Sequence, residues 1–302
     1  MAIGQLTRRF MLFIANPISG SRSNSYICSR LEKSGYKVAY TEYAGHAEFI
    51  ARQASEHTIV AVGGDGTVNE VARGILGSDK VLGIIPCGSG DGLALHLGIS
   101  RRYEKALDTV INGAVHPLDA GLINGRLFLS VCGVGFDAVV SERFAKSGKR
   151  GLLSYVEQGL NVWKEFRPEK YRITIDGRTW DNDAALITVG NSRQWGNGAM
   201  ITPLADSSDG LLDVTMADMF TTIEIPSLAF LLMTGYIDKS SRIHCYKGRN
   251  IHISRKCSGP AHADGDFFEA GTEIDISRKY RGTPNHRRRG KEGSHRASLV
   301  RR

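Results

Sequence analysis

The segment VAVGGDGTVNEVARGIL, from Val60 to Leu76, joins an apolar run to a helical pattern through a loop of three glycines, an aspartate and a threonine. Glycine permits positive φ and close backbone approach, so successive N–H groups can point at one anion, and a helix behind the loop adds a favourable dipole. The segment therefore predicts a strand, a phosphate-binding loop and a helix. Asp65 is explained if Mg²⁺ bridges it to phosphate oxygens or if it binds a hydroxyl group. The alternative is that Asp65 caps a helix that starts at Thr67.

Apolar runs and helical patterns alternate through the first 110 residues. The apolar runs are FMLFIAN (10–16), YKVAYTE (36–42), TIVAVGG (58–64) and VLGIIP (81–86), and the helical patterns cover 23–34, 46–56 and 67–76. Short β-branched runs separated by amphipathic segments indicate βαβ units and a parallel sheet, with functional groups at the carboxyl ends of the strands.

Two more glycine loops follow strand ends in this region, NPISGSRS (16–23) and PCGSGDG (86–92). A single glycine turn is weak evidence, but three at the same edge of one sheet describe a phosphate cradle. The chain has no G-x-x-x-x-G-K-[ST] motif, and no G-x-G-x-x-G opens a helix after the first strand. A P-loop is therefore excluded and a Rossmann dinucleotide site is unsupported.

The second region, from about residue 113, has the pattern of an antiparallel β domain. Asn124-Gly125 and Asp176-Gly177 are two-residue hairpin signals, and helical segments are expected only at about 151–166 and 222–235. The predicted organisation is an α/β domain at 1–112, a β domain at 113–280 and a basic tail at 281–302. Whether the last strand of the first domain returns from near the C-terminus stays open.

The basic residues are concentrated at the C-terminus. Eight of the 39 Lys and Arg residues lie in 281–302 with Glu292 as the only acid, so this segment carries +7 of the formal +8. Because it has few large apolar residues, we expect it to be disordered. Its function would be attachment to anionic lipid; the alternative is a solvated terminus or nonspecific contact with nucleic acid.

The cysteines, the histidines and the apolar runs bear on the compartment, on metal binding and on membrane insertion. The five cysteines are scattered without a C-x-x-C pair, which indicates a reducing compartment and no zinc site. His46, His96 and His262 show no metal spacing, so surface or capping roles are expected. No apolar run is long enough to span a membrane, and the longest candidate, IPSLAFLLMTGY (225–236), has the length of a buried helix.

A series of motifs in order carries a resemblance. The motifs are ANPISGS, TEYAGHA, VAVGGDGTVNEV, IIPCGSGDGLALHLGI, NSRQWGNGAMITPLADSSDGLLDV and ADGD. Together they resemble the diacylglycerol kinase catalytic superfamily, the lipid kinases that also include sphingosine and ceramide kinases. The resemblance implies transfer of the γ-phosphoryl group of ATP, with Mg²⁺, to the hydroxyl group of a sphingoid base, a ceramide or a diacylglycerol. It implies an NAD kinase-like α/β nucleotide-binding domain, a C-terminal antiparallel β-sandwich and a cleft between them.

The resemblance also implies site residues. The nucleotide-binding residues would be Asn16, Pro17, Ser19, Gly20, Thr41, Gly63, Gly64, Asp65, Gly66, Thr67, Gly88, Ser89 and Gly90. Asp266 would position the attacking hydroxyl group as general base, and Asp65 would be the second catalytic residue by helping Mg²⁺ to bridge the phosphates. Asp264 and Asp91 would meet the substrate. A structural Mg²⁺ would take the Asp209 carboxylate and the carbonyl groups of Asp206 and Leu211.

Two departures from the family pattern bear on the acceptor. Asp266 stands where the family has Glu in its D-G-E element, and Asp91-Gly92 stands where many diacylglycerol kinases have Asn-Asp. They leave open an inactive kinase-like lipid-binding protein. An NAD kinase, which shares GGDGT and a two-domain organisation, is a second alternative, although GSGDG and DGLLDV argue against it. A cytoplasmic protein held peripherally at the inner face of the membrane is expected, without a specific nucleic-acid partner; a homodimer stays open.

Overall fold

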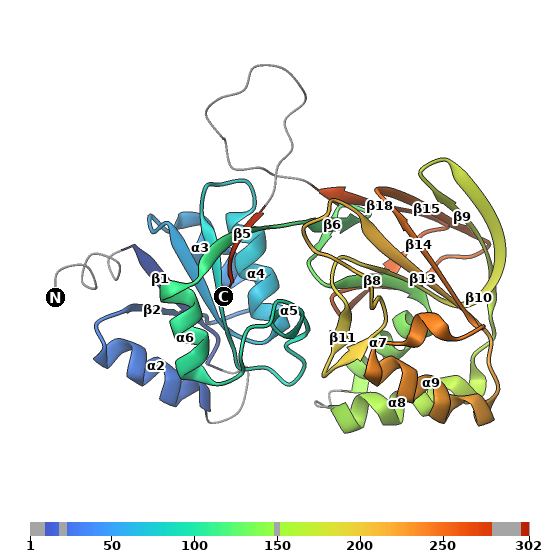
Figure 1. The fold of residues 1–302 in the computed structure, drawn as a ribbon, viewed down its shortest axis with the longest axis horizontal. Helices are drawn as coiled ribbons and strands as arrows, with labels where there is room; N and C mark the ends of the chain where they lie inside the picture. The colour runs from blue at the N-terminus through green and yellow to red at the C-terminus, as the bar shows by residue number, and fades with distance from the viewer. Residues whose placement is uncertain (1–9, 18–22, 148–151, 280–296, 302) are drawn as a thin grey trace, which may run out of the picture. The chain divides into compact units, whose positions relative to one another are not determined.

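The computed structural model describes residues 10–17, 23–147, 152–279 and 297–301. The chain forms two compact units, which are described separately (Figure 1). Unit 1 comprises Met1–Asp119 and Tyr280–Arg302, and unit 2 comprises Ala120–Lys279. In the part of the chain that the structure describes, no helix combines the length and the apolar character required to cross a membrane.

Unit 1 is built on a six-stranded sheet in the order β2-β1-β3-β4-β19-β5. The strands are β1 (Met11–Ala15), β2 (Lys37–Tyr40), β3 (Thr58–Gly63), β4 (Val81–Pro86), β5 (Ala114–Leu118) and β19 (Ala297–Arg301), and the helices are α2 (Ser23–Lys33), α3 (His46–Gln53), α4 (Asp65–Ile75), α5 (Gly92–His96) and α6 (Tyr103–Asn112). The first four strands run parallel. Nearly every residue of β1, β3 and β4 is buried, as expected for a parallel sheet covered on both faces. The predicted α/β domain is therefore confirmed.

Strand β19 corrects the predicted limits of the first domain and of the tail. It pairs parallel to β4 and antiparallel to β5, so the end of the chain completes the sheet of unit 1. The expectation of a tail over all of 281–302 is thus wrong for residues 297–301; residues 280–296 lie outside the described part. Because β5 joins this sheet, unit 1 continues to Asp119 rather than ending at residue 112.

Unit 2 is an antiparallel β-sandwich-like domain. Its main strand order is β17-β16-β8-β10-β9-β15-β18-β6-β7, and β13 pairs with both β10 and β14. The strands are β6 (Ala120–Ile123), β7 (Arg126–Phe128), β8 (Val131–Gly135), β9 (Glu169–Ile175), β10 (Arg178–Gly190), β11 (Gln194–Gly196), β12 (Ala199–Met200), β13 (Leu212–Asp218), β14 (Ile243–Gly248), β15 (Asn250–Arg255), β16 (Gly259–Ala263), β17 (Asp266–Ala270) and β18 (Glu273–Lys279). Both predicted hairpins are present, and their Asn-Gly and Asp-Gly pairs have positive φ.

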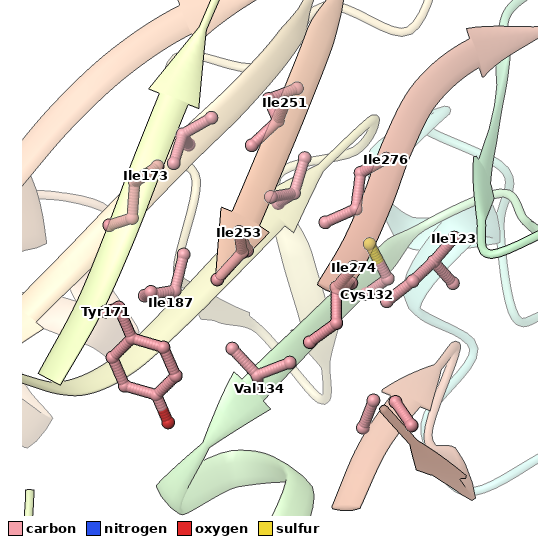
Figure 2. Packing of buried hydrophobic residues seen from close by; sticks show 14 of the residues in the cluster. Ile123, Cys132, Val134, Tyr171, Ile173, Ile187, Ile251, Ile253, Ile274 and Ile276 are labelled. Carbon is pink, nitrogen blue, oxygen red and sulfur yellow. The ribbon is translucent and has the colours of Figure 1, made fainter. Parts of the chain in front are cut away.

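Alternating isoleucines build the core of unit 2. Ile251 and Ile253 on β15 lie opposite Ile276 and Ile274 on β18, and all four are buried. Figure 2 shows these side chains in one buried cluster that also includes Tyr171 and Ile173 of β9. The period of two places them on one face of the sheet, while the residues between them face away.

The helices of unit 2 are α7 (Phe136–Ser147), α8 (Leu152–Glu165) and α9 (Ile225–Thr234), with short 3₁₀ turns η1 (Thr222–Glu224) and η2 (Ile237–Lys239). Helices α8 and α9 match the predicted segments, whereas α7 was not predicted. The expectation that 225–236 forms a buried helix is wrong, because Leu228 is the only buried residue of α9.

Candidate active site

Four loops of unit 1 meet at one edge of its sheet. Because β2, β1, β3 and β4 are parallel neighbours, the segments that follow their carboxyl ends share that edge. The predicted nucleotide-binding residues found there are Asn16, Pro17, Thr41, Gly63, Gly64, Asp65, Gly66, Thr67, Gly88, Ser89 and Gly90. Ser19 and Gly20 lie outside the described residues.

The glycine loops after β3 and β4 are in backbone contact. A Cβ atom added to Gly88 would lie 2.6 Å from the Cα of Gly64, and one added to Gly64 would lie 3.1 Å from the Cα of Gly88. The N–H group of Cys87 also donates a hydrogen bond of 2.9 Å to the carbonyl oxygen of Gly63. Side chains at positions 64 and 88 would therefore separate two loops that the sequence predicts to bind the same phosphates.

The carboxylate of Asp65 fastens these loops together. Asp65 is the first residue of α4, and its carboxylate accepts hydrogen bonds from the backbone N–H groups of Asp91, Gly92 and Leu93. The side chain thus satisfies the first turn of α5, where backbone donors lack partners within the helix. The alternative expectation, that Asp65 caps a helix from Thr67, is wrong because α4 starts at Asp65 and the capped helix is α5.

This geometry also bears on Mg²⁺. The backbone N–H groups of Asp91, Gly92, Leu93 and Asp65 itself stabilise the charged form of the carboxylate. Coordination of Mg²⁺ by Asp65 stays a prediction. Burial raises the pKa of this carboxyl group, while the hydrogen bonds from the backbone oppose the shift.

Asp91 is the second buried acid at this edge. It lies at the N-cap position of α5 with a φ of 47°, and only 3% of it is exposed. Its Oδ1 accepts a hydrogen bond of 2.9 Å from the N–H of Gly88, and its Oδ2 lies 3.2 Å from Nε of Arg101. Burial raises the pKa of Asp91 to about 6, although Arg101 acts in the opposite direction. The buried Asp91 side chain therefore holds the backbone of the loop at Gly88 and is not exposed at its surface.

Arg101 completes the support of this loop. Its NH2 nitrogen donates hydrogen bonds of 3.1 and 2.8 Å to the carbonyl oxygens of Ser89 and Gly90. Arg101 thus holds the loop together with Asp91. The sequence analysis did not predict a role for Arg101. The only sequence signal for this role is the presence of a basic residue ten positions after Asp91.

In unit 2, the ADGD element forms the tight turn between β16 and β17. Asp264 and Gly265 have φ values of 51° and 87°, as in a two-residue hairpin turn. The Asp264 carboxylate accepts hydrogen bonds from the N–H groups of Leu129, Ser130 and Val131 at 2.7, 2.8 and 3.0 Å. Asp264 is therefore a positioning residue that holds the turn against the start of β8. Asp266, the first residue of β17, is exposed.

A buried cluster of polar side chains joins α7, β10 and β16. Oδ2 of Asp137 on α7 accepts a hydrogen bond of 2.8 Å from Oγ1 of Thr188 and lies 3.0 Å from Nε2 of His262 on β16. The exposed fraction of His262 is 2%, so the expectation of a surface role for it is wrong. His46, the first residue of α3, accepts at Nδ1 a hydrogen bond of 3.1 Å from the N–H of Glu42, which precedes the helix.

The predicted structural metal loop lies between β12 and β13. The Asp209 carboxylate accepts the N–H of Leu211 through Oδ1, and its Oδ2 lies 3.4 Å from Nζ of Lys247. The same ammonium group lies 3.3 Å from Oδ2 of Asp213. Asp206 binds the backbone N–H and hydroxyl of Ser208.

The donor set of this loop suits a hard cation, because carboxylate oxygens converge on one point. In this structure the converging charge is the Lys247 ammonium, which also donates a hydrogen bond of 3.1 Å to the carbonyl oxygen of Leu204. Burial raises the pKa of Asp213 to about 6, and Lys247 opposes that shift. No cluster of three or more metal-ligating side chains occurs among the described residues. Lys247 thus lies where a cation would contact Asp209 and Asp213, so a Mg²⁺ ion would have to displace it, and the metal site stays a prediction.

Comparisons with known proteins agree with this division of the chain. The family model of the diacylglycerol kinase catalytic domain matches residues 10–123, and that of the YegS C-terminal NAD kinase beta sandwich-like domain matches residues 130–274. A diacylglycerol kinase of Mycobacterium tuberculosis (strain ATCC 25618 / H37Rv) is 30% identical over 288 residues, which cover 88% of this chain and 93% of the relative. A diacylglycerol kinase of Bacillus subtilis (strain 168) is 28% identical over 268 residues, with 84% and 88% covered.

A solved structure of a diacylglycerol kinase from Bacillus anthracis str. Sterne has a TM-score of 0.72 at 20% identity and covers 97% of this chain and 96% of its own. At that identity the likeness bears on the fold, an α/β domain with a parallel sheet followed by a β-sandwich-like domain. The sequence similarity, unlike the structural likeness, is high enough to show the family. The chain belongs to the diacylglycerol kinase catalytic superfamily of lipid kinases.

Proposed function

We propose that this protein transfers the γ-phosphoryl group of ATP to a lipid hydroxyl group, and that diacylglycerol is the acceptor. The glycine loops of unit 1 would bind the phosphates through backbone N–H groups, which is the chemistry that close backbone approach provides. The choice of diacylglycerol rests on relatives of that name that are similar over most of the chain. A sphingoid base or a ceramide is the competing acceptor.

The observation that carries the proposal is the placement of two carboxylates in one turn. Asp264 accepts hydrogen bonds from three backbone N–H groups, which fix the turn, and Asp266, two residues later, is exposed. An exposed carboxylate on a rigid turn can orient a hydroxyl group for attack and accept its proton. Phosphoryl transfer requires mainly such positioning, so Asp can act in place of the longer Glu.

The Mg²⁺ ion that accompanies ATP would be held near the Asp65 carboxylate and would neutralise charge on the phosphates. Asp65 would also keep the loops after β3 and β4 together through its hydrogen bonds to the start of α5.

The test is a phosphorylation assay with labelled ATP and a panel of diacylglycerol, sphingosine, dihydrosphingosine, ceramide and NAD. We expect diacylglycerol to be phosphorylated and Asp266→Ala to lower kcat by about 10²- to 10⁴-fold, with the KM for ATP unchanged. Glu269→Ala, which alters another exposed acid on β17, is the matched control and should retain activity. Phosphorylation of NAD alone would favour an NAD kinase. An unmutated protein without activity on any acceptor would support an inactive lipid-binding protein.

A further inference from the structure

An apolar surface without an assigned role runs along α9 of unit 2. Ile223, Phe230, Met233 and Tyr236, here called the α9 stripe, are 88%, 67%, 53% and 59% exposed. Phe230 and Met233 lie three residues apart on the helix and so share one face, while Ile223 in η1 and Tyr236 lie just beyond its two ends. The stripe therefore places four large, exposed apolar side chains within a segment of 14 residues, from Ile223 to Tyr236.

The composition of this segment is unusual for an exposed helix. No Asp, Glu, Lys or Arg occurs from Ile225 to Ile237. A helix at the surface of a globular protein normally carries charged residues on its outer face. The opposite, inner face of α9 is anchored, because Leu228 is buried. The helix thus has a fixed orientation and an outer face suited to an apolar environment.

The charges at both ends of the stripe neutralise each other in pairs. Glu224 accepts a hydrogen bond of 3.0 Å from Arg242, and Asp238 lies 2.9 Å from Nζ of Lys239. A partner that binds here therefore gains little from electrostatic attraction, which argues against a strongly charged peptide.

We propose that the α9 stripe is the surface by which this protein docks on a lipid bilayer. The inference rests on the proposed function, because a diacylglycerol acceptor resides in a membrane. The four side chains expose about 500 Å² on the area scale of large apolar residues. A stable protein interface needs about 800 Å² from each partner, so this area alone falls short of a second copy of the chain. A short apolar helix face lying in the interfacial region of a bilayer has no such minimum, and Tyr236 has the amphipathic character typical of that region.

This docking differs from attachment through basic residues. Because the stripe is apolar and its flanking charges are paired, it should bind vesicles of neutral phosphatidylcholine and retain binding in 1 M NaCl. Attachment through a basic tail would require anionic lipid and would weaken with salt.

The first test is cosedimentation with neutral phosphatidylcholine vesicles. The double variant Phe230→Ser, Met233→Ser should lower the partition coefficient at least tenfold. The control Phe49→Ser removes a side chain of similar exposure, 55%, from α3 of unit 1 and should leave the partition coefficient unchanged. Thermal melting checks that both variants are folded. Binding that is unaltered by the double variant, or that is lost in 1 M NaCl, would overturn the proposal.

The second test locates the contact. Tryptophan fluorescence of Phe230→Trp should be quenched by vesicles of phosphatidylcholine brominated in the acyl chains, whereas that of Phe49→Trp should change no more than the native tryptophans do. Equal quenching of both would contradict docking through α9. If light scattering showed a dimer that the double variant converts to a monomer while vesicle binding persists, the stripe would be a subunit interface instead.

Failure of the docking surface can be separated from failure of the proposed function. On short-chain diacylglycerol in detergent micelles the double variant should be as active as the unmutated protein, and on long-chain diacylglycerol in vesicles at least tenfold less active. Equal activity of the two proteins on vesicles would contradict the docking role and leave the kinase function intact. Absence of activity in both assays, with vesicle binding still dependent on the stripe, would reject the kinase function alone.

Discussion

Replacing Gly88 by alanine tests whether the two glycine loops act as one unit. The added Cβ atom would lie 2.6 Å from the Cα of Gly64 and 2.8 Å from Oδ1 of Asp91. Carbon atoms in contact are normally 3.5 to 4.0 Å apart, so one loop must move by about 1 Å. The movement also stretches the hydrogen bond between the Gly88 N–H and Asp91. Overpacking of this kind costs about 1–3 kcal/mol.

We expect Gly88→Ala to lower the melting temperature by about 3 to 10 °C in differential scanning fluorimetry, at roughly 2–4 °C per kcal/mol. Because the loops must be placed together to bind phosphates, kcat/KM should fall about 100-fold. Gly66→Ala is the matched control, since a Cβ atom at Gly66 meets nothing within 4 Å, and its melting temperature should equal or slightly exceed that of the unmutated protein. A Gly88→Ala protein as stable as the Gly66→Ala protein would refute the reasoning.

Two further predictions concern buried acids. The pKa of Asp91 is raised from 3.8 to about 6, so the folded state binds the Asp91 proton more tightly than the unfolded state does. The contribution of protonated Asp91 to the free energy of unfolding is therefore complete below pH 4 and is lost as the pH rises through 6. The Asp91→Asn protein cannot lose this proton, so it should avoid a pH-dependent loss of at most about 3 kcal/mol in the free energy of unfolding. Thermal melts of both proteins from pH 4 to 7.5 measure the difference, and melting temperatures that fall in parallel would contradict it. Lys247→Met leaves Asp209 and Asp213 without their shared cation and should lower stability by about 1 kcal/mol. Millimolar Mg²⁺ should then raise its melting temperature more than that of the unmutated protein or of the control Lys239→Met, and equal shifts would argue against cation binding in this loop.

Much of the α/β unit and the hairpins of unit 2 could be predicted because their determinants are local. The β-branched runs, the glycine loops and the two-residue hairpin turns each depend on residues adjacent in sequence. The gathering of the loops at one sheet edge follows from the parallel arrangement alone. The family motifs then gave the order of the two domains.

The parts that could not be predicted depend on contacts between distant residues. Lys247 reaches the Asp209 loop because β13 and β14 pair with Asp213 opposite Lys247. Asp264 binds the backbone at Leu129 to Val131 because β16 pairs with β8, more than 120 residues earlier in the chain. No sequence period encodes such pairings.

Helix α9 illustrates a different limit. Its apolar composition correctly predicts a helix of this length, but composition cannot distinguish a helix covered by protein from one exposed at the surface. Only the exposed fractions of Phe230 and Met233 separate the two cases.

The position of β19 has a consequence for synthesis of the chain. Strand β5 belongs to unit 1 but pairs within its sheet only with β19, which ends at Arg301. The ribosome must therefore complete the whole of unit 2 before the sheet of unit 1 can close. At typical elongation rates this interval is about 10 to 40 s. During that time the exposed edge of β4 is a template for pairing with other chains, so nascent unit 1 is open to aggregation until β19 is made.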